Sequence, residues 1–318
     1  MQAALYRRYG GPEVIEFADL PRPVPSAHEV LIKVEASSVN PIDWKRGSGA
    51  LRVIMPALLP LVPGYDVAGT VVEMGSEASD FGVGTRVHAR LSDSRGGASA
   101  QFAVVSTDML ARVPHGMSSL DAAAIPLAGM TALQGLRDSL KLELNNSKAR
   151  VLVVGASGGV GHFAVQIAHA SGADVVGVCS ARNAELVRGL GANEVIDYAA
   201  PDALKGLTPV DLVLDCVSGH AAPWLPLLVN GGRYASPVVT PGLLARQLLN
   251  PLANKKELIV MLKANAEDLS LLDQMWSDKK LRVVTDSVYP LARLGQAWAH
   301  SIEGHAAGKI VVEIASAL

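Results

Sequence analysis

The sequence is poor in cysteine and has no long uninterrupted apolar run. Its 318 residues include two cysteines, Cys179 and Cys216, which fall in or just after expected strands. They favour small core residues over a disulfide or a metal site and suggest a reducing compartment, so we expect a cytoplasmic protein. The richest apolar run of the N-terminal third, residues 53–62, is interrupted by two prolines. No run approaches the roughly 20 apolar residues of a membrane span, so we expect no integral membrane segment.

An excess of charge of one sign is also missing. The net charge is −2 at pH 7, so the chain has no electrostatic footprint for nucleic acid or an anionic membrane. The first residues, MQAALYRRYGG, lack the apolar core of a secretory signal. The hydrophobic share of 49% and the charged share of 18% are typical of a globular protein with large buried sheets. A chain of 318 residues is long enough for two domains.

The most informative stretch is residues 151–161, VLVVGASGGVG. A short apolar run of β-branched residues predicts a buried parallel strand, and an apolar helical pattern follows the glycines. Ala156-x-Gly158-x-x-Gly161 matches the dinucleotide fingerprint with Ala in first place. The N–H groups of the helix N-terminus suit a pyrophosphate. We therefore predict that the turn binds a dinucleotide through Ser157, Gly158, Gly159, Val160 and Gly161.

The expected secondary structure changes near Leu120. The first ~120 residues look β-rich, whereas residues 120–142 have helical spacing with a boundary at Pro126. Strands and helices then alternate, which predicts βαβ crossovers and a doubly wound parallel sheet in an α/β protein. After about Asp268 we expect a helix over residues 269–276, a strand over 281–284, another helix and a last strand over 309–314. The pattern leaves open whether this tail belongs to the parallel sheet or to the first domain.

The second strand of the parallel sheet indicates which nicotinamide cofactor binds. A carboxylate at its end would bind the ribose of NAD, but this strand ends at Cys179 and Ser180. Arg182 and Asn183 follow, and a guanidinium suits a 2′-phosphate. We predict NADPH, with Ser180, Arg182 and Asn183 around the phosphate. The alternative is that Arg182 only caps or solvates the next helix.

Seven segments together resemble a known family. They are NPIDWK (40–45), PGYDVAGTVVEMGS (63–76), PLAGMTALQGL (126–136), GASGGVG (155–161), SARN (180–183), LGANEVIDY (190–198) and GHAAGKIVVE (304–313). They are similar to the medium-chain dehydrogenase/reductase superfamily, and within it to the zinc-free quinone oxidoreductases of the chloroplast-envelope type and the related enone oxidoreductases. The resemblance implies a GroES-like β-rich domain formed by residues 1–122 and 268–318, with a Rossmann domain, residues 123–267, inserted into it. It also implies a homodimer, and it raises a chloroplast location peripheral to the envelope as an alternative to the cytoplasm.

The resemblance also bears on zinc. Zinc-dependent relatives place a Cys where this chain has Asn40 and a His where it has Tyr65, and the stretch PLAGMT, where a third ligand would precede the threonine, contains no Cys. A catalytic zinc needs about three protein ligands. We therefore predict no metal.

Without zinc the chain loses the Lewis acid for alcohol–ketone exchange, but hydride transfer to an activated acceptor is still feasible. We predict an NADPH-dependent reductase of quinones or α,β-unsaturated carbonyls. The alternatives are a reductase of an enoyl thioester and a cofactor-binding protein with little turnover.

The resemblance places Asn40 and Thr131 near the nicotinamide and its ribose, although a turn or helix-cap role would also explain both. Lys45 matches a lysine of enone-reducing relatives and could steer the substrate carbonyl or hold the cofactor ribose; the alternative is a solvated lysine. Tyr65 could donate the proton or stack on the acceptor, and the alternative is a packed core tyrosine.

Two more loops and one tyrosine complete the predicted cofactor site. Asp215, Cys216 and Val217 end one strand and Val239 follows the next, where ligands lie outside the carboxyl ends of parallel strands. Tyr198 could stack on the adenine or reach the 2′-phosphate, and surface packing is its alternative.

Overall fold

The computed structural model describes residues 1–78, 80–93 and 96–314. The chain divides into two compact units. Unit 1 consists of Met1–Leu127, Ala264–Ser277 and Val283–Leu318, and unit 2 of Ala128–Lys263 and Asp278–Arg282. The chain therefore passes from unit 1 to unit 2 twice.

Unit 2 is built on one parallel sheet. Its strands are β8 (Arg150–Val154), β9 (Asp174–Cys179), β10 (Glu194–Asp197), β11 (Val210–Asp215), β12 (Leu228–Ser236) and β13 (Lys256–Ile259). They follow the order β10-β9-β8-β11-β12-β13, and every neighbouring pair is parallel. This is the order of a doubly wound dinucleotide-binding sheet, so the Rossmann prediction is confirmed.

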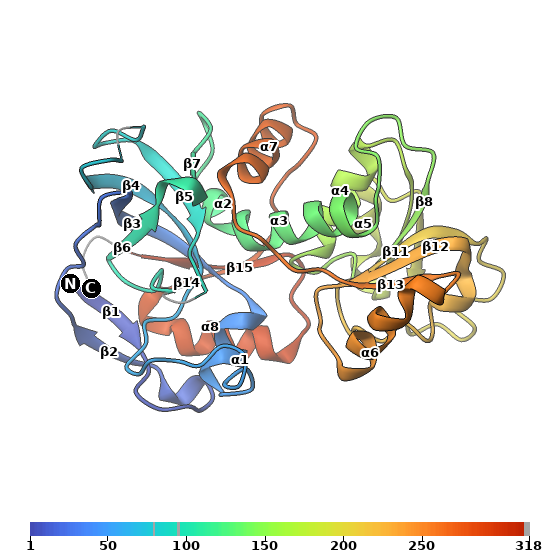
Figure 1. The fold of residues 1–318 in the computed structure, drawn as a ribbon, viewed down its shortest axis with the longest axis horizontal. Coiled ribbons are helices and arrows are strands. Elements are labelled where there is room, and N and C mark those ends of the chain that lie inside the picture. Colours follow the sequence, from blue (N-terminus) through green and yellow to red (C-terminus); the bar gives the residue numbers. More distant parts are fainter. Residues whose placement is uncertain (79, 94–95, 315–318) are drawn as a thin grey trace. The chain divides into compact units, whose positions relative to one another are not determined.

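The central strands explain why the apolar runs fold here. Val151, Leu152 and Val153 of β8 are completely buried, because β8 lies between β9 and β11. A parallel strand covered on both faces carries a continuous apolar run rather than an alternating one. Figure 1 shows the helices of this unit, α4 (Gly161–Ala170), α5 (Ala184–Gly189) and α6 (Pro241–Leu249), with the sheet. Two further helical segments, α3 (Pro126–Gln134) and the π-helical stretch Gly135–Ser139, precede β8.

Unit 1 is built on a seven-stranded sheet. Its path is β14-β15-β3-β4-β5-β7, and β6 also pairs with β3. The strands are β3 (Glu29–Val39), β4 (Asp66–Met74), β5 (Arg86–Arg90), β6 (Phe102–Ser106), β7 (Leu110–Arg112), β14 (Thr285–Pro290) and β15 (Lys309–Glu313). The long strand β3 pairs with β4 along one edge and with β6 and then β15 along the other. The prediction that the N-terminal part of the chain is β-rich is confirmed.

The remaining elements of unit 1 surround this sheet. A two-stranded sheet is formed by β1 (Gln2–Leu5) and β2 (Glu16–Asp19). The helices are α1 (Pro41–Gly47), α2 (Ser119–Ala124), α7 (Ala266–Ser277) and α8 (Leu294–Glu303). Trp298 of α8 is 1% exposed and packs in the same apolar core as Tyr6, Ile32 and Val312.

The strand predicted over residues 281–284 is wrong. The strand of this region is β14, Thr285–Pro290, which pairs with β15. Residues 281–284 do not join a ladder, because both backbone polar groups of Arg282 bind the side chain of Gln166 instead. Helix α6 was not predicted. Among the described residues, no helix combines the length and the apolar character that crossing a membrane requires.

Candidate functional site

The glycine-rich turn forms directly after β8. Gly155 has a φ of +75°, a left-handed conformation that favours glycine, and its N–H donates to the carbonyl of Val178 at 3.0 Å. A Cβ on Gly161 would lie 2.0 Å from the carbonyl oxygen of Gly155, so only glycine lets α4 start this close to the strand. A Cβ on Gly158 would lie 3.3 Å from the carbonyl oxygen of Gly155, a close contact that glycine avoids. The turn therefore has the compact glycine backbone at the start of a helix that a pyrophosphate site needs.

A hydrogen bond ties this turn to the loop after β9. The side-chain amide of Asn183 donates to the Ser157 hydroxyl oxygen at 3.0 Å. Ser180 is half-buried at the end of β9, and Arg182 is exposed in the short helical turn Ala181–Asn183 that precedes α5. Because Ser157 accepts from Asn183, its own hydroxyl proton can be donated to another group. The structure thus places four of the predicted cofactor residues around one corner of the sheet.

The loop after β11 is organised by a buried carboxylate. Asp215 is 0% exposed and accepts hydrogen bonds from the N–H groups of Val217, Ser218 and Gly219 at 2.9–3.1 Å. The Tyr234 hydroxyl donates to the same carboxylate at 2.7 Å, and burial and this contact raise the pKa of Tyr234. This set of donors fixes the backbone at the carboxyl end of β11.

A second link joins the loops after β11 and β12. The Ser236 hydroxyl donates to the carbonyl of Asp215 at 2.7 Å and accepts from the N–H of Val238 at 3.1 Å. Val217 and Val239, in these two loops, are 61% and 54% exposed. Apolar side chains exposed on rigid loops at the carboxyl edge can contact a flat cofactor ring. Cys216 is half-buried, and burial raises the pKa of its thiol, so it is not a reactive thiolate.

Tyr198 and Thr131 lie in contrasting surroundings within unit 2. Tyr198 follows β10, its N–H donates to the carbonyl of Cys179 at 3.2 Å, and its side chain is 61% exposed. Thr131 is on α3 and is 4% exposed. Tyr198 is therefore placed next to the end of β9 with its ring open to solvent, whereas Thr131 is packed.

In unit 1, Asn40 belongs to a buried polar cluster. Its Oδ1 accepts from Lys309 Nζ at 2.6 Å, and its Nδ2 donates to Asp66 Oδ2 at 2.8 Å. The Ser38 hydroxyl and the N–H of Leu127 also donate to Asp66, at 2.7 and 2.8 Å. Lys309 Nζ lies 3.6 Å from the Asp66 carboxylate, and the two side chains are 2% and 0% exposed. The ammonium on one side and the carboxylate on the other fix the orientation of the Asn40 amide.

A second buried carboxylate connects Asn40 with the neighbourhood of Tyr65. Asp43 accepts from the N–H of Asn40 at 2.7 Å and from the N–H of Gly64 at 3.1 Å. Burial raises the pKa of Asp43 to about 7, and these N–H groups and Lys309 oppose the rise. Burial likewise lowers the pKa of Lys309, with Asp66 and Asp43 opposing it. Asn40 and Tyr65, far apart in sequence, are thereby brought to one region of the unit.

Tyr65 is a packed residue. It is 2% exposed, and its hydroxyl oxygen accepts from Arg46 Nη1 at 2.7 Å. Burial raises the pKa of Tyr65 to about 12, although Arg46 opposes the rise. Lys45, on the same helix as Arg46, is half-buried with its ammonium 5.4 Å from the centre of the Trp44 ring.

Comparisons with known proteins cover nearly the whole chain. The "Alcohol dehydrogenase GroES-like domain" family matches residues 26–115, which confirms the GroES-like prediction, and the "Zinc-binding dehydrogenase" family matches residues 190–312. The chloroplast envelope quinone oxidoreductase homolog of Arabidopsis thaliana is 40% identical, covering 98% of each chain. The NADPH-dependent alkenal/one oxidoreductase of the same plant is 32% identical over 98% of this chain and 79% of its own. The structure of the quinone oxidoreductase from Coxiella burnetii matches with a TM-score of 0.90 and 31% identity, covering 99% of each chain.

The chain belongs to the medium-chain dehydrogenase/reductase superfamily and is of the quinone oxidoreductase type. It is an NAD(P)H-dependent oxidoreductase, and the recognition of this family from the sequence is confirmed.

The residues of this quinone oxidoreductase-type chain do not fit a zinc ion, despite the description of the second matching family. Within residues 1–78, 80–93 and 96–314, no group of three or more His, Cys, Asp or Glu side chains could hold a metal. The polar cluster that contains Asn40 and Asp66 already holds a cation of its own, the Lys309 ammonium. A divalent ion placed beside that ammonium would be repelled.

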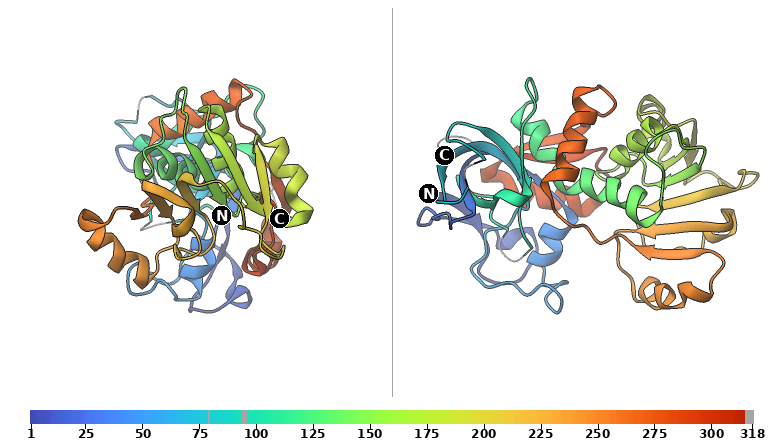
Figure 2. Two further views of the ribbon diagram at one scale, coloured as in Figure 1. Left: turned by 90° about the vertical axis from the view of Figure 1, so that its right-hand side faces the viewer. Right: turned by 45° about the horizontal axis from the view of Figure 1, so that its top comes forward.

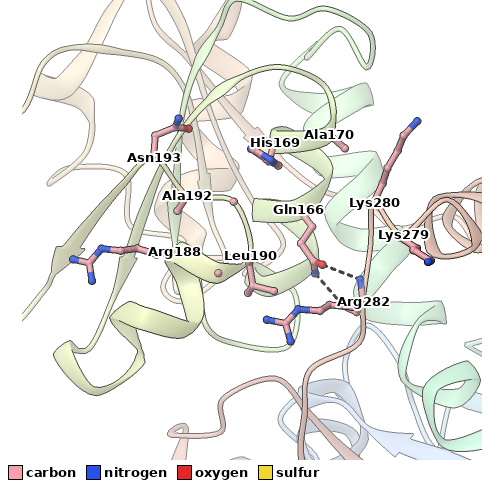
Figure 3. A pocket seen from close by; sticks show the side chains of 12 residues that line it. Gln166, His169, Ala170, Arg188, Leu190, Ala192, Asn193, Lys279, Lys280 and Arg282 are labelled. Atoms are coloured by element: carbon pink, nitrogen blue, oxygen red, sulfur yellow. Dashed lines mark hydrogen bonds between the residues drawn. The ribbon is translucent and has the colours of Figure 1, made fainter.

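A surface pocket of this oxidoreductase lies away from the glycine-rich turn of its parallel sheet. Figure 3 shows its lining side chains, which come from the second half of α4, the end of α5 with the loop that follows it, and the segment Asp278–Arg282. His169 is eight residues beyond Gly161 on α4, about 12 Å along the helix. Several cationic side chains line the pocket, but Arg188, Lys279 and Lys280 point away from one another. This pocket is thus separate from the cofactor loops.

Sequence reasoning missed two residues of the oxidoreductase's polar clusters, namely Lys309 and Arg46. Each is a charged residue in an expected strand or a short helix, and each is buried in the structure, Lys309 at 2% and Arg46 at 3% exposure. An ionisable residue within a predicted buried strand is the signal that could have identified Lys309.

Proposed function

We propose that this chain is an NADPH-dependent reductase of quinones or α,β-unsaturated carbonyls that transfers hydride directly and without a metal. The observation that carries the proposal is the corner formed by the glycine-rich turn and the loop after β9. There Ser157 and Asn183 are hydrogen-bonded, no carboxylate ends β9, and Arg182 is exposed. The identity of 40% with a quinone oxidoreductase homolog supports the acceptor class.

Each part of the cofactor has residues suited to it. The turn from Ser157 through Gly158, Gly159 and Val160 to Gly161 would hold the pyrophosphate at the N-terminus of α4 on backbone N–H groups other than that of Gly158, which donates to the Gly155 carbonyl at 2.9 Å. Ser180, Arg182 and Asn183 would hold the 2′-phosphate, and Tyr198 would lie against the adenine end. The fixed loops that carry Cys216, Val217 and Val239 would flank the nicotinamide.

The bound nicotinamide supplies the hydride, so the chain itself has to orient the reactants and deliver a proton. Asn40 and Thr131 are proposed to orient the nicotinamide and its ribose. Lys45 is proposed to steer the acceptor carbonyl with its ammonium. Tyr65 has two proposed roles: proton donor, because its oxygen accepts from Arg46 and its proton is left to donate, or packed residue, which its 2% exposure favours. No step requires a Lewis acid when the acceptor is already electron-poor.

The test of the acceptor class is NADPH oxidation by the purified protein with four acceptors side by side: a quinone, a medium-chain enone, the corresponding saturated ketone and an enoyl thioester. We expect turnover with a quinone and with a medium-chain enone, none with the corresponding saturated ketone, and rates that a chelator does not change. Turnover of the saturated ketone that the chelator abolishes would overturn the metal-free proposal. Turnover of an enoyl thioester alone, or of no acceptor despite tight NADPH binding, would support the two alternatives instead.

The test of the cofactor is Arg182→Ala, with Arg188→Ala as the matched control. Both arginines are exposed near α5, but Arg188 pairs with Glu185 and lines the surface pocket away from the glycine-rich turn. We expect Arg182→Ala to raise the KM for NADPH roughly tenfold or more and to leave the KM for NADH unchanged, as the loss of a charge-assisted hydrogen bond predicts. Arg188→Ala should change neither. If Arg182→Ala keeps the wild-type preference for NADPH over NADH, Arg182 does not bind the 2′-phosphate.

Compartment and assembly complete the proposal. We propose a cytoplasmic location, with the chloroplast envelope as the alternative, and fractionation of cells expressing a tagged full chain distinguishes the two. We also propose a homodimer, which sedimentation of the purified protein tests.

A further inference from the structure

The surface pocket drawn in Figure 3 takes no part in the proposed reaction. It has a volume of about 710 Å³ and is lined by residues of unit 2 alone. Two of its walls come from α4, which packs on β8 and β9, and from α5, which packs on β9 and β10. Figures 1 and 2 show both helices, in yellow-green, beside the parallel sheet. The pocket is therefore complete within unit 2.

The third wall of the pocket is the segment Asp278–Arg282. Gln166 of α4 binds both backbone polar groups of Arg282, with its Oε1 2.8 Å from the Arg282 nitrogen. Lys279, in the turn that follows α7, has a φ of +60°, a left-handed conformation that favours glycine. The turn and the amide contact set Lys279, Lys280 and Arg282 beside the second half of α4.

The lining of the pocket carries charge of one sign. None of the described residues that line it is acidic, whereas its exposed basic side chains are His169, Arg188, Lys279, Lys280 and Arg282. The chain as a whole has a net charge of −2, so the pocket locally reverses the overall sign. A hollow lined by charges of one sign focuses their field and attracts ions of the opposite sign. The pocket therefore suits an anion.

Two of these cations have acidic neighbours outside the lining. Arg188 pairs with Glu185, and Lys280 Nζ lies 3.6 Å from Asp278 Oδ2. All four side chains are exposed, and an exposed ion pair of this kind contributes little free energy. An anionic group of a ligand can therefore replace either carboxylate at low cost.

The cations surround the pocket and do not converge on one point. In Figure 3, Arg188 lies on one side of the pocket, Lys279 and Lys280 lie on the other, and the three side chains point away from one another. A single small anion would meet only one side. An extended ligand with several anionic groups along its length can meet cations on both sides.

The rest of the lining favours a polypeptide as that ligand. It includes the small residues Ala170, Gly189, Gly191 and Ala192, which leave room for a backbone to approach. A Cβ on Gly191 would lie 2.4 Å from the His169 ring, so only glycine lets this ring lie against the loop after α5. None of the described lining residues is Phe, Tyr or Trp, so the pocket lacks the aromatic platforms on which single-stranded nucleic acids stack.

We propose that this pocket binds an acidic segment of a partner polypeptide, whose carboxylates pair with Arg188, Arg282, Lys279 and Lys280. Arginine binds a carboxylate through two parallel N–H groups, and lysine binds it as a point charge. The pocket is separate from the glycine-rich turn, so the partner binds without displacing the cofactor. This interaction goes beyond the proposed reductase activity and does not depend on it.

Titration of a fluorescein-labelled octaglutamate peptide with the purified full chain, followed by anisotropy, tests the proposal. We expect binding that weakens as the salt concentration rises, that saturating NADPH does not change, and that is tighter than the binding of a single-stranded oligonucleotide of equal charge. Lys279 and Arg282 form no ion pair with another described residue, so their removal breaks no internal pair.

Lys279→Gly removes one cation and gives the left-handed position the residue that it favours, so the fold is retained. We expect it to raise the Kd for the peptide roughly two- to fivefold, the range for one exposed ion pair. The triple variant with Arg188→Gln and Arg282→Gln should raise the Kd roughly tenfold or more, because these pairs add when their sites are separate.

Lys141→Gly is the matched control, because Lys141 is another exposed lysine of unit 2, has a φ of +62° and lies outside the pocket. It should leave the Kd unchanged. Equal weakening in Lys141→Gly and Lys279→Gly, or no weakening in the triple variant, would show that the pocket does not bind the peptide. Displacement of the peptide by NADPH, or tighter binding of the oligonucleotide, would likewise overturn the proposal, because the ligand would then bind at the cofactor loops or be a nucleic acid.

Discussion

The side-chain amide of Gln166 binds both backbone polar groups of Arg282. Gln166 Oε1 accepts from the Arg282 N–H at 2.8 Å, and Nε2 donates to the Arg282 carbonyl at 3.0 Å, across 116 residues of sequence. Gln134 does the same with Lys263, at 2.9 and 2.7 Å. In both cases a carboxamide takes the place of a neighbouring strand for an extended segment of unit 2. These contacts lie at the two points at which the chain leaves that unit.

We expect Gln166→Met to destabilise unit 2 by about 1–3 kcal/mol, because a side chain of similar length removes two part-buried hydrogen bonds to the backbone of Arg282, each contributing about 0.5–1.5 kcal/mol. Urea unfolding measures the loss, and proteolysis should cut the segment Asp278–Arg282 faster in the variant. Gln296→Met, at an exposed position of α8, is the matched control and should cost nothing measurable. Equal stabilities of the two variants would show that the paired amide does not hold the segment.

These amide contacts also show which elements could not be predicted from the sequence. The strand and helix around the glycine-rich turn were predictable because β8 and α4 carry local patterns, a continuous apolar run and a 3.6-residue period. The strand expected at residues 281–284 was wrong because its backbone partners come from Gln166, and no local pattern encodes a contact across 116 residues. Helix α6 was not predicted, and in the structure it buries only Leu243.

The residues of the candidate site also fall into two groups, those with a local sequence signal and those brought in by distant contacts. Ser157, Gly158 and Arg182 were predictable because the fingerprint and the end of the second strand have fixed spacing. The partners that hold the site were not: Lys309 reaches Asn40 across 269 residues. The sequence predicts which residues would meet a ligand, and the structure shows which residues hold those predicted residues in place.

Lys309→Met should destabilise the protein by about 3–5 kcal/mol, because it leaves the Asp66 carboxylate buried without its cation. The distance of 3.6 Å between the two groups and their near-complete burial make a double-mutant cycle with Asp66→Asn informative. We expect the double variant to lose less than the sum of the single losses, with a coupling energy of about 1–3 kcal/mol from urea unfolding. Strict additivity would show that Lys309 and Asp66 do not interact energetically.

Asp43 should give the protein a pH-dependent stability of a definite sign. Its pKa is raised from 3.8 to about 7 by burial, so the folded chain binds this proton more tightly than the unfolded chain. The stabilising contribution of protonated Asp43 to the free energy of unfolding is fully present below about pH 4. It is lost as the pH rises to about 7. The unfolding free energy of the wild type minus that of Asp43→Asn should therefore fall between these values, by up to about 4 kcal/mol, and then level off. A difference that rises with pH over the same interval would contradict the burial effect.

Tyr65→Phe separates proton donation from packing. A phenol with a pKa of about 12 stays protonated at neutral pH and is a weak acid for a neutral reaction. We expect the variant to keep kcat within about threefold and to lose about 0.5–1.5 kcal/mol of stability, the usual contribution of one hydrogen bond such as that from Arg46. Activity and urea unfolding are measured on the same preparation. A fall in kcat of about a hundredfold or more, with the KM values unchanged, would instead identify Tyr65 as the proton donor.

Asp215→Asn should weaken NADPH binding without any direct contact to the cofactor. Its carboxylate accepts from three successive N–H groups of the loop after β11, and an amide of the same shape brings a donor against some of these donors. We expect the Kd for NADPH, measured by fluorescence titration, to rise roughly tenfold as the loop loses its fixed geometry. Tyr234→Phe is the control, because it removes a donor from the same carboxylate at 2.7 Å and leaves the loop N–H groups bound. Its Kd should stay within about twofold of the wild type, with the loss confined to stability. If both variants bind NADPH as the wild type does, the backbone held by Asp215 is not part of the cofactor site.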